Sequence, residues 1–401
     1  MISMMRLAPA AVLAAACCFA PLAQAQDVIK IGDINSYKGQ PAHLENYKRG
    51  MELALDEVNA SGGVNGKKVV LVMRDDNQNP GDAVRAAEEL ISREQVQALS
   101  GSFLSNVALA LGDFAKQRKV FFLATMSLSD RMIWQNGNAY SFRLRAGTYT
   151  QTAMLVEEAV KLKKKRWALV YPNYEFGQSA AATFKSMLKA AQPDVEFVAE
   201  QAPPLGKLEP GAVVQAMADA KPDAIFNVLF GADLIKFVRA GQTRGLFEGR
   251  EVVSLVTGEP ENLEPLKDDT PNGWIVTGYP PHDVKTPEHA TFANAYQAKF
   301  KDYPRLSSVM GYSTIKSITE GMKKAKSVET DKLVAAFANL QVDTPFGRIT
   351  YRPNDNQSTI GSFIGKTKNQ NGTGVMVESR YRDGAQFQPS AEEVRKLRPA
   401  Q

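Results

Sequence analysis

The stretch VQALSGSFLSNVALALGDFAKQRKVFFLA, residues 96–124, contains the pattern that decides the fold of this chain. An apolar run at Val96–Ser100 leads through a loop of small and polar residues into the helical pattern of Val107–Arg118. A second apolar run, Val120–Ala124, follows directly. Strands that alternate with helices in this way form parallel sheets covered by helices on both faces. The stretch therefore predicts an α/β fold.

The same alternation of strand and helix continues along most of the chain. Asn79-Pro80 supplies an N-cap and a proline for the first turn of a helix, and Ser61-Gly62-Gly63 ends the helix before it. So many strands predict two doubly wound parallel sheets instead of one very wide sheet. The further strand candidates are Val28–Ile34, Val69–Met73, Trp167–Tyr171, Val195–Ala199, Ala224–Leu229 and Val252–Val256.

The first 25 residues have the features of a secretory signal peptide. Arg6 provides the positive charge, Leu7–Phe19 is a short apolar core, and Ala23-Gln24-Ala25 is a cleavage pattern of small residues. An apolar run of this length is too short to span a bilayer comfortably. We therefore expect an exported protein whose signal peptide is cleaved near Ala25.

Both cysteines of the chain, Cys17 and Cys18, lie within this signal segment. A disulfide framework, a thiolate metal site and a cysteine nucleophile are therefore excluded from the mature chain. A lipid anchor would need an aliphatic residue three positions before the cysteine. Ala14 and Ala15 stand at those positions, so no lipid anchor is expected.

The composition argues against several classes of function. The formal net charge is only +5 over 401 residues, whereas nucleic-acid binding would need a concentrated basic patch. The one dense basic run, Lys161–Arg166, is expected to be a solvated helix end. The chain has three histidines and no HExxH, GxSxG or P-loop motif, so the sequence predicts no metal, cofactor or catalytic site. An exported hydrolase remains the weaker alternative.

The loop inside the opening stretch is the first candidate binding site. In doubly wound sheets, ligands bind at the carboxyl ends of the strands, where helices begin. Ser105 and Asn106 stand at such a helix start, and the free N–H groups there suit a carboxylate. The alternative is that Ser105 only caps its own helix. The loop after the next strand, residues 125–130 (TMSLSD), is also rich in hydroxyl groups.

The order of these segments resembles the type I periplasmic binding proteins for leucine, isoleucine and valine. The most specific match is VNASGGVNG at 58–66, and it is accompanied along the chain by IKIGDINSYKG, WALVYPNYEFGQ and DTPFGRITY. The resemblance implies two lobes joined by three crossing segments. Lobe one would comprise residues 27–145 plus 278–345, and lobe two would comprise residues 146–277 plus 346–401.

The resemblance also implies roles for particular residues. The family serine that receives the ligand carboxylate aligns with Ser105. The next loop normally offers a hydroxyl group to the ligand's amino group. Its positions fall on Met126 and Leu128, or on Ser127 if the register differs by one. An apolar side chain there would remove that hydroxyl group.

Two aromatic residues, a glutamate and two residues of the first loop complete the implied site. The aromatic residues would line the second lobe, and the glutamate would neutralise the ligand's ammonium group. The two aromatic residues are Phe176 and Phe230, and the glutamate is Glu259, with Glu261 as the alternative. The two residues of the first loop are Tyr37 and His43.

The resemblance thus implies a monomeric periplasmic protein that captures an apolar or branched-chain amino acid by hinge closure and presents it to an inner-membrane ABC permease. The alternative on the same scaffold is an aromatic or aliphatic carboxylate without an amino group. Met126, Leu128 and the phenylalanines favour this alternative, whereas Glu259 favours the amino acid. A membrane receptor in place of the permease is an alternative for the partner.

Overall fold

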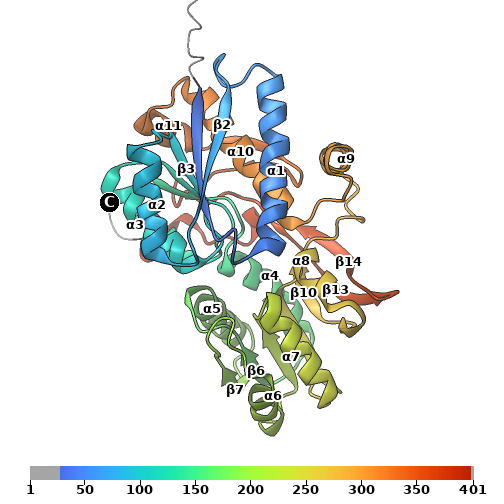
Figure 1. The fold of residues 1–401 in the computed structure, drawn as a ribbon. Helices are drawn as coiled ribbons and strands as arrows, with labels where there is room; N and C mark the ends of the chain where they lie inside the picture. Colours follow the sequence, from blue (N-terminus) through green and yellow to red (C-terminus); the bar gives the residue numbers. More distant parts are fainter. Residues whose placement is uncertain (1–27, 399–401) are drawn as a thin grey trace, which may run out of the picture.

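The computed structural model describes residues 28–398, which form two lobes, one above the other in Figure 1. The expected signal peptide, with Cys17, Cys18 and the cleavage position near Ala25, lies outside the described residues. Within residues 28–398, no helix combines the length and the apolar character that a membrane crossing needs.

The first lobe is built on a parallel five-stranded sheet with helices on both faces (Figure 1). Its elements are β1 (Ile29–Asn35), α1 (Pro41–Ala60), β2 (Val69–Asp75), α2 (Pro80–Ser92), β3 (Ala98–Gly101), α3 (Ser105–Arg118), β4 (Phe122–Ala124), β5 (Ser141–Arg143) and α10 (Leu306–Ala325). The strand order is β2-β1-β3-β4-β5, and every neighbouring pair is parallel. The order reverses between β1 and β3, and such a reversal is where doubly wound sheets bind ligands.

The second lobe repeats this topology and adds an antiparallel hairpin. Its elements are α4 (Thr148–Lys161), β6 (Arg166–Val170), α5 (Glu175–Ala191), β7 (Glu196–Gln201), α6 (Pro210–Asp219), β8 (Ala224–Asn227), α7 (Gly231–Thr243), β9 (Glu251–Gly258), α8 (Pro260–Leu263), η2 (Glu264–Asp269), β10 (Ile275–Gly278), β13 (Ser362–Gln370) and β14 (Thr373–Arg382). The strand order is β14-β13-β10-β9-β8-β6-β7. Only the pairings of β10 with β13 and of β13 with β14 are antiparallel.

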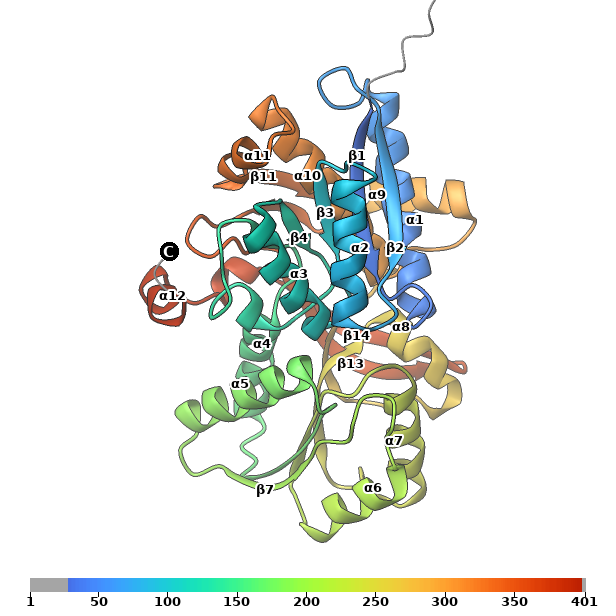
Figure 2. The same ribbon diagram turned by 60° about the vertical axis from the view of Figure 1, so that its left-hand side comes forward.

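The remaining elements are η1 (Asp130–Met132), α9 (Pro287–Phe300), α11 (Thr330–Phe337), β11 (Gln341–Thr344), β12 (Gly347–Thr350), η3 (Gly384–Gln386) and α12 (Ala391–Leu397). Figure 2 shows α9, α11, β11 and α12 beside the first lobe. η1 follows β4 within that lobe, and η3 precedes α12. The chain therefore passes between the lobes after β5, after β10 and after β12, which are the three crossing segments that the resemblance implied. After β14 the C-terminal α12 returns to the first lobe, which adds a fourth passage.

The expected boundary at residues 345 and 346 falls inside a small two-stranded sheet. β11 pairs with β12 across this point, from Thr344 with Gly347 to Gln341 with Thr350. At the C-terminal end, the Arg398 side chain donates to the carbonyl oxygens of Asn138 (2.8 Å) and Asn354 (2.9 Å). The lobe ranges remain a prediction: the β11–β12 pairing favours a third crossing close to residue 361, and the Arg398 contacts place the C-terminal end beside the first lobe.

Local sequence signals explain several element boundaries. The side chain of Asn79 accepts hydrogen bonds from the N–H groups of Gly81 (2.8 Å) and Asp82 (3.1 Å), which confirms it as the N-cap of α2. The glycine-rich run after α1 is a connecting turn. Gly63 has a φ of +76°, and a Cβ there would lie 2.0 Å from the carbonyl oxygen of Lys67, so only glycine fits.

Among the strands that pair in parallel, β5 and β10 are absent from the predicted set. β5 has three residues and β10 has four, which is too short for an apolar pattern to separate a strand from a loop. Each of the two strands directly precedes a passage of the chain between the lobes. Their omission matters, because the loop that follows β5 belongs to the site.

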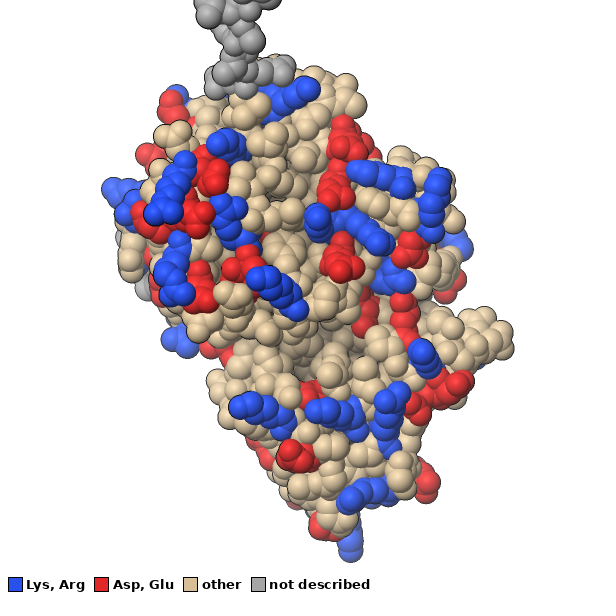
Figure 3. Space-filling model, viewed as in Figure 1, with Lys and Arg blue, Asp and Glu red and all other residues tan. Residues whose placement is uncertain are grey.

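The carboxyl ends of the two parallel sheets face each other where the lobes meet (Figure 1). In the space-filling view the molecule narrows at this level, and Lys, Arg, Asp and Glu side chains are mixed over both lobes (Figure 3). The loops at the ends of β1, β3, β4, β5, β6, β8 and β9 therefore approach one another from two sides. This arrangement positions the candidate site.

Candidate functional site

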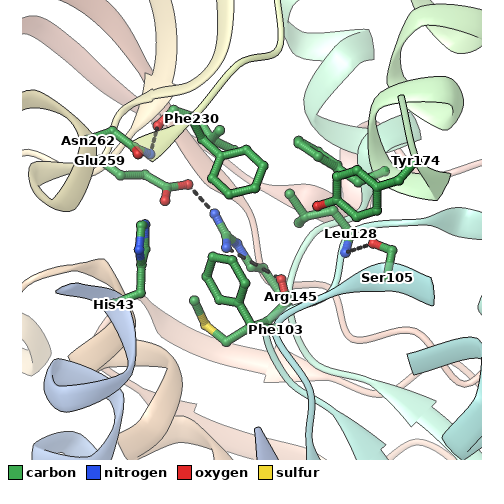
Figure 4. A pocket seen from close by; sticks show the side chains of 12 residues that line it. His43, Phe103, Ser105, Leu128, Arg145, Tyr174, Phe230, Glu259 and Asn262 are labelled. Carbon is green, nitrogen blue, oxygen red and sulfur yellow. Dashed lines mark hydrogen bonds and ion pairs between the residues drawn. The ribbon is translucent and has the colours of Figure 1, made fainter. Parts of the chain in front are cut away.

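A pocket with about 340 Å³ of space between its side chains lies where the two lobes meet (Figure 4). The first lobe contributes His43, Phe103, Ser105, Met126, Leu128 and Arg145, and the second lobe contributes Tyr174, Phe176, Phe230, Val256, Glu259 and Asn262. The lining is largely aromatic and aliphatic, with a few polar groups, as ligand pockets commonly are.

Seven of the ten residues expected at the site line this pocket: His43, Ser105, Met126, Leu128, Phe176, Phe230 and Glu259. The structure does not bring Tyr37, Asn106 and Ser127 into the lining. The Tyr37 hydroxyl instead donates to the buried carboxylate of Asp33 (2.6 Å). The buried Ser127 hydroxyl lies outside the pocket and has no hydrogen-bond partner among the described residues.

Ser105 is the first residue of α3 and does not cap it. The N-cap position belongs to Leu104, which makes no side-chain cap bond. The Ser105 Oγ instead accepts hydrogen bonds from the N–H groups of Leu128 (3.3 Å) and Ser129 (3.2 Å). Both bonds use the oxygen as the acceptor, so the hydroxyl hydrogen remains available to an acceptor in the pocket. The first N–H groups of α3 also lack partners within the helix.

A buried arginine fixes the loop that carries Leu128 by hydrogen bonds. Arg143, at the end of β5, donates to the carbonyl oxygens of Leu128 (3.0 Å) and Ser129 (2.6 Å) and to the Asp130 carboxylate (2.7 Å). Met126 and Leu128 then present apolar side chains to the pocket. The register of this loop therefore places no hydroxyl group of residues 126–128 in the lining.

Aromatic rings from both lobes form the walls of the pocket. The ring of Phe103 lies 4.9 Å from that of His43 and 6.0 Å from that of Phe230, measured between centroids. The ring of Phe176 lies 6.0 Å from that of Phe230 and 6.1 Å from that of Tyr174. These separations are typical of favourable aromatic pairs. The contact of Phe103 with Phe230 joins the two lobes.

The polar end of the pocket holds an ion pair between Arg145 and Glu259 (Figure 4). Their side chains are only 7% and 3% exposed. Burial raises the pKa of Glu259 to about 7, and the charge of Arg145 opposes this rise. Glu261 plays a different part, because its carboxylate accepts the N–H of Ser307 at the start of α10 (2.8 Å). Of the two glutamates that the sequence left open, Glu259 therefore faces the pocket.

His43 lies beside this pair, in the first turn of α1. Burial, together with the nearby charge of Arg145, lowers the pKa of His43 to about 3. Its Nδ1 atom is buried and has no hydrogen-bond partner among the described residues. At neutral pH the imidazole is therefore uncharged, with one donor and one acceptor nitrogen.

Val256 has a backbone conformation that β-branched residues rarely adopt, with a φ of +60°. Two side chains hold it there. Thr277 accepts its N–H (2.9 Å), and the Asn262 amide donates to its carbonyl oxygen (2.9 Å). Backbone strain that neighbouring groups maintain is concentrated at functional sites in proteins. This observation agrees with the position of Val256 in the pocket wall.

Five lining residues were not predicted: Phe103, Arg145, Tyr174, Val256 and Asn262. Phe103 stands inside the loop quoted at the outset, two positions before Ser105, and Tyr174 stands two positions before Phe176. The signal for these two was therefore present. Arg145 could be predicted only if β5 were recognised as a strand, because Arg145 lies in the loop that follows the carboxyl end of β5. Among residues 28–398, no group of three or more His, Cys, Asp or Glu side chains is arranged to hold a metal ion.

Comparisons with known proteins extend over most of the described chain. The sequence model of one family, described as periplasmic binding protein, matches residues 28–373. A curated relative, Leu/Ile/Val-binding protein homolog 7 of Brucella melitensis, is 26% identical over 392 residues, which cover 93% of this chain and 94% of the relative. Homolog 8 of Brucella abortus is 25% identical and covers 89% of each chain.

Two solved structures share the fold of both lobes. The first is a solute-binding protein of an ABC transporter from Rhodopseudomonas palustris in complex with 3,4-dihydroxybenzoic acid. It has a TM-score of 0.79 and 24% identity, and covers 90% of this chain and 99% of that one. The second is a branched-chain amino acid transporter substrate-binding protein from Streptococcus pneumoniae in complex with isoleucine. It has a TM-score of 0.77 and 20% identity, and covers 89% and 100%.

Proposed function

Because this chain belongs to the periplasmic binding protein family, we propose that it is the solute-binding component of an ABC-type uptake system and captures a small carboxylate with an apolar body between its lobes. One observation carries this proposal. Ser105, at the start of α3, and aromatic side chains of both lobes line a single pocket. The pocket therefore offers a polar position for an acid group and an apolar space for the rest of the ligand.

The start of α3 supports the choice of a carboxylate. Unpaired N–H groups and the positive end of the helix dipole stabilise an anion at such a position. The Ser105 hydroxyl hydrogen is free to be donated, while its oxygen is held by the N–H groups of Leu128 and Ser129. A ligand carboxylate would thus meet a donor whose position is already fixed, which lowers the entropy lost on binding.

The origin of the lining residues supports closure of the two lobes around the ligand. Six lining residues come from each lobe, and Arg145 and Glu259 pair across the boundary between them. A ligand that touches both lobes stabilises the closed arrangement through its contacts with both, and so shifts the population toward it. We expect the solute to be enclosed by this hinge motion and released when the lobes separate.

Two classes of solute fit the proposal. An apolar or branched-chain amino acid is favoured by Glu259, which would partner the ligand's ammonium group, and the Brucella relatives are named for leucine, isoleucine and valine. A carboxylate without an amino group is favoured by the apolar side chains of Met126 and Leu128. The Rhodopseudomonas palustris protein, which is bound to 3,4-dihydroxybenzoic acid, is an example of this second class.

The proposal includes the setting in which the protein acts. As a periplasmic binding protein the chain is exported, and we expect its signal peptide to be cleaved near Ala25 without a lipid anchor. The partner would be an inner-membrane ABC permease, which receives the solute from a monomeric protein. The family is one of solute-binding proteins and not of enzymes, so we expect binding without turnover.

A thermal-shift screen of the mature protein tests this function. The panel contains aliphatic and aromatic monocarboxylates, the common amino acids, and sugars and polyamines as unrelated solutes. A ligand present at about 100 times its Kd adds roughly 2.7 kcal/mol to stability, which is visible as a higher Tm. We expect only members of the carboxylate and amino acid groups to raise the Tm. If none of them does so at millimolar concentration, or if sugars or polyamines do so instead, the proposed function is wrong.

A further inference from the structure

Arg145 and Glu259 are the two side chains in the pocket lining that can carry opposite charges, and they neutralise each other when Glu259 is ionised. Arg145 follows β5 in the first lobe, and Glu259 follows β9 in the second. Their contact is buried on all sides, and Figure 4 shows the Glu259 carboxylate directed at the guanidinium group. With Glu259 ionised, the ligand-free pocket is therefore already balanced in charge.

A ligand ammonium group would have to compete with Arg145 for the same carboxylate. A guanidinium group does not lose its proton in proteins, so Arg145 cannot become neutral to make room. An arriving ammonium would either displace Arg145 from Glu259 or add a second buried cation beside it. Because the ligand's own carboxylate is taken up at Ser105 and the start of α3, either outcome leaves one of the two cations without a carboxylate partner, which is unfavourable for a buried charge.

The other polar groups of the lining offer an ammonium group little in exchange. The Ser105 oxygen already accepts two N–H groups. The Asn262 side chain accepts the N–H of Gly231 (3.0 Å) and donates to the carbonyl of Val256 (2.9 Å). The Met126 sulfur is only a weak acceptor, and Leu128 has none on its side chain. Besides Glu259, this leaves an ammonium group with three N–H donors only the acceptor nitrogen of His43 and the Tyr174 hydroxyl.

We propose that Arg145 determines the class of ligand, because its guanidinium group occupies the place beside Glu259 that a ligand ammonium would take. The pocket then accepts carboxylates that lack an amino group and rejects the corresponding amino acids. This inference rests on the proposed function and narrows it. Specificity of this kind comes from a built-in repulsion as much as from attraction.

The walls of the pocket narrow the class further. Four phenylalanine and tyrosine rings and the uncharged His43 ring surround the space, and the rings of Phe103 and Phe230 approach from opposite lobes. An aromatic ligand ring can make offset or edge contacts with such rings that an aliphatic chain cannot make. The expected solute is therefore an aromatic monocarboxylate without an amino group.

Matched ligand pairs test the proposal by calorimetry on the dialysed mature protein. 3-Phenylpropanoate is compared with phenylalanine, and 4-methylpentanoate with leucine, because the members of each pair differ only in the amino group. We expect each acid to bind at least about tenfold more tightly than its amino acid, and 3-phenylpropanoate more tightly than 4-methylpentanoate. Equal or tighter binding of the amino acids would overturn the proposal.

Variants of the ion pair then assign the effect to Arg145. Arg145→Gln frees Glu259, and we expect the affinity for phenylalanine and leucine to rise at least about tenfold relative to the acids. Glu259→Gln keeps the cation, so the amino acids should stay excluded and the acids should bind as well or better. The double variant R145Q/E259Q is the matched control, because without Glu259 the gain of R145Q should disappear.

The outcomes separate this inference from the function on which it rests. If wild type binds neither member of any pair, the proposed function fails. If wild type binds the acids but Arg145→Gln, shown to be folded by circular dichroism, gains nothing for the amino acids, only the role of Arg145 fails. Should R145Q not fold, Glu259→Gln decides the question, since improved amino acid binding in that variant would contradict the proposal.

Discussion

Arg145 and Glu259 form a buried ion pair that joins the end of β5 in the first lobe to the end of β9 in the second. Each residue belongs to a loop at the carboxyl edge of its own sheet, so the pair exists only while the lobes are close together. It balances the charge of the pocket and at the same time links the two halves of the molecule. Ligand selection and lobe closure therefore depend on the same contact.

The pH dependence of stability should reveal the buried state of Glu259. Its pKa rises from 4.5 to about 7 on folding, mainly because of burial. Between these values the unfolded chain has lost a proton that the folded protein still holds, so stability should fall as the pH rises from 4.5 to 7. The contribution has a slope of at most about 1.4 kcal/mol per pH unit. Urea unfolding of Glu259→Gln should lack this fall, and curves parallel to wild type would contradict the prediction.

His43 should act in the opposite direction. Its pKa falls from 6.5 to about 3 on folding. Between these two pH values His43 is therefore protonated in the unfolded chain and unprotonated in the folded protein. Stability should therefore be lost as the pH falls from 6.5 toward 3, and His43→Gln should lose less of it. His289, whose pKa is lowered to about 4, is a buried histidine outside the pocket and provides the matched control. His289→Gln should alter the same part of the stability curve but leave ligand affinity unchanged.

Much of the fold could be predicted from the sequence, because its strands are apolar and its helix ends carry clear signals. Asn79-Pro80 and the glycines after α1 predict boundaries that depend only on neighbouring residues. β5 could not be found in this way, because its three residues, Ser141–Arg143, are recognised as a strand only by their pairing with β4. Such a strand is defined by the sheet and not by its own sequence.

The candidate site could also be predicted only in part. Ser105, Phe176 and Phe230 stand where helices begin after predicted strands. Because ligands of doubly wound sheets bind at the carboxyl ends of the strands, the sequence predicts these three residues at one site. The partner of Glu259 could not be predicted, since Arg145 lies 114 residues away along the chain and in the other lobe. Sequence reasoning assigns Glu259 to a ligand ammonium because a buried carboxylate needs a cation. The structure supplies that cation from within the chain.

Removal of the Ser105 hydroxyl should weaken carboxylate binding. Ser105→Ala deletes a donor at the start of α3 and leaves a charged acceptor short of one hydrogen bond, which costs about 1–3 kcal/mol. Calorimetry should therefore show an affinity roughly 5 to 150 times lower. Ser141→Ala is the control, because this buried hydroxyl accepts a hydrogen bond from the Asn138 amide (3.0 Å) and neither residue lines the pocket. Equal affinities for wild type and Ser105→Ala would assign Ser105 a purely structural role.

The aromatic walls should favour aromatic ligands over aliphatic ones. Phe230 has ring contacts with both Phe103 and Phe176, so Phe230→Leu removes edge contacts while keeping an apolar side chain. Affinity for an aromatic acid should fall by about 0.5–1.5 kcal/mol more than affinity for an aliphatic acid of similar size. Phe226→Leu serves for comparison, since Phe226 stacks on Phe184 in the core (3.9 Å between centroids). That variant should lower the Tm without changing the ratio of the two affinities.

A second contact between the lobes should influence ligand affinity without touching the ligand. Glu264, in η2 of the second lobe, accepts hydrogen bonds from the Tyr303 hydroxyl (2.8 Å) and from Nε of Arg305 (2.9 Å), which belong to the first lobe. Glu264→Ala removes these contacts from the closed arrangement and shifts the population toward open molecules. We expect a two- to tenfold loss of affinity, or about 0.4–1.4 kcal/mol, together with a larger radius of gyration of the ligand-free protein in solution scattering. Glu320→Ala is the control, because Glu320 pairs with Lys323 within α10 and does not link the lobes. If Glu264→Ala matches that control in both measurements, the lobes are held together by other contacts, of which the Arg145–Glu259 pair is the first to examine.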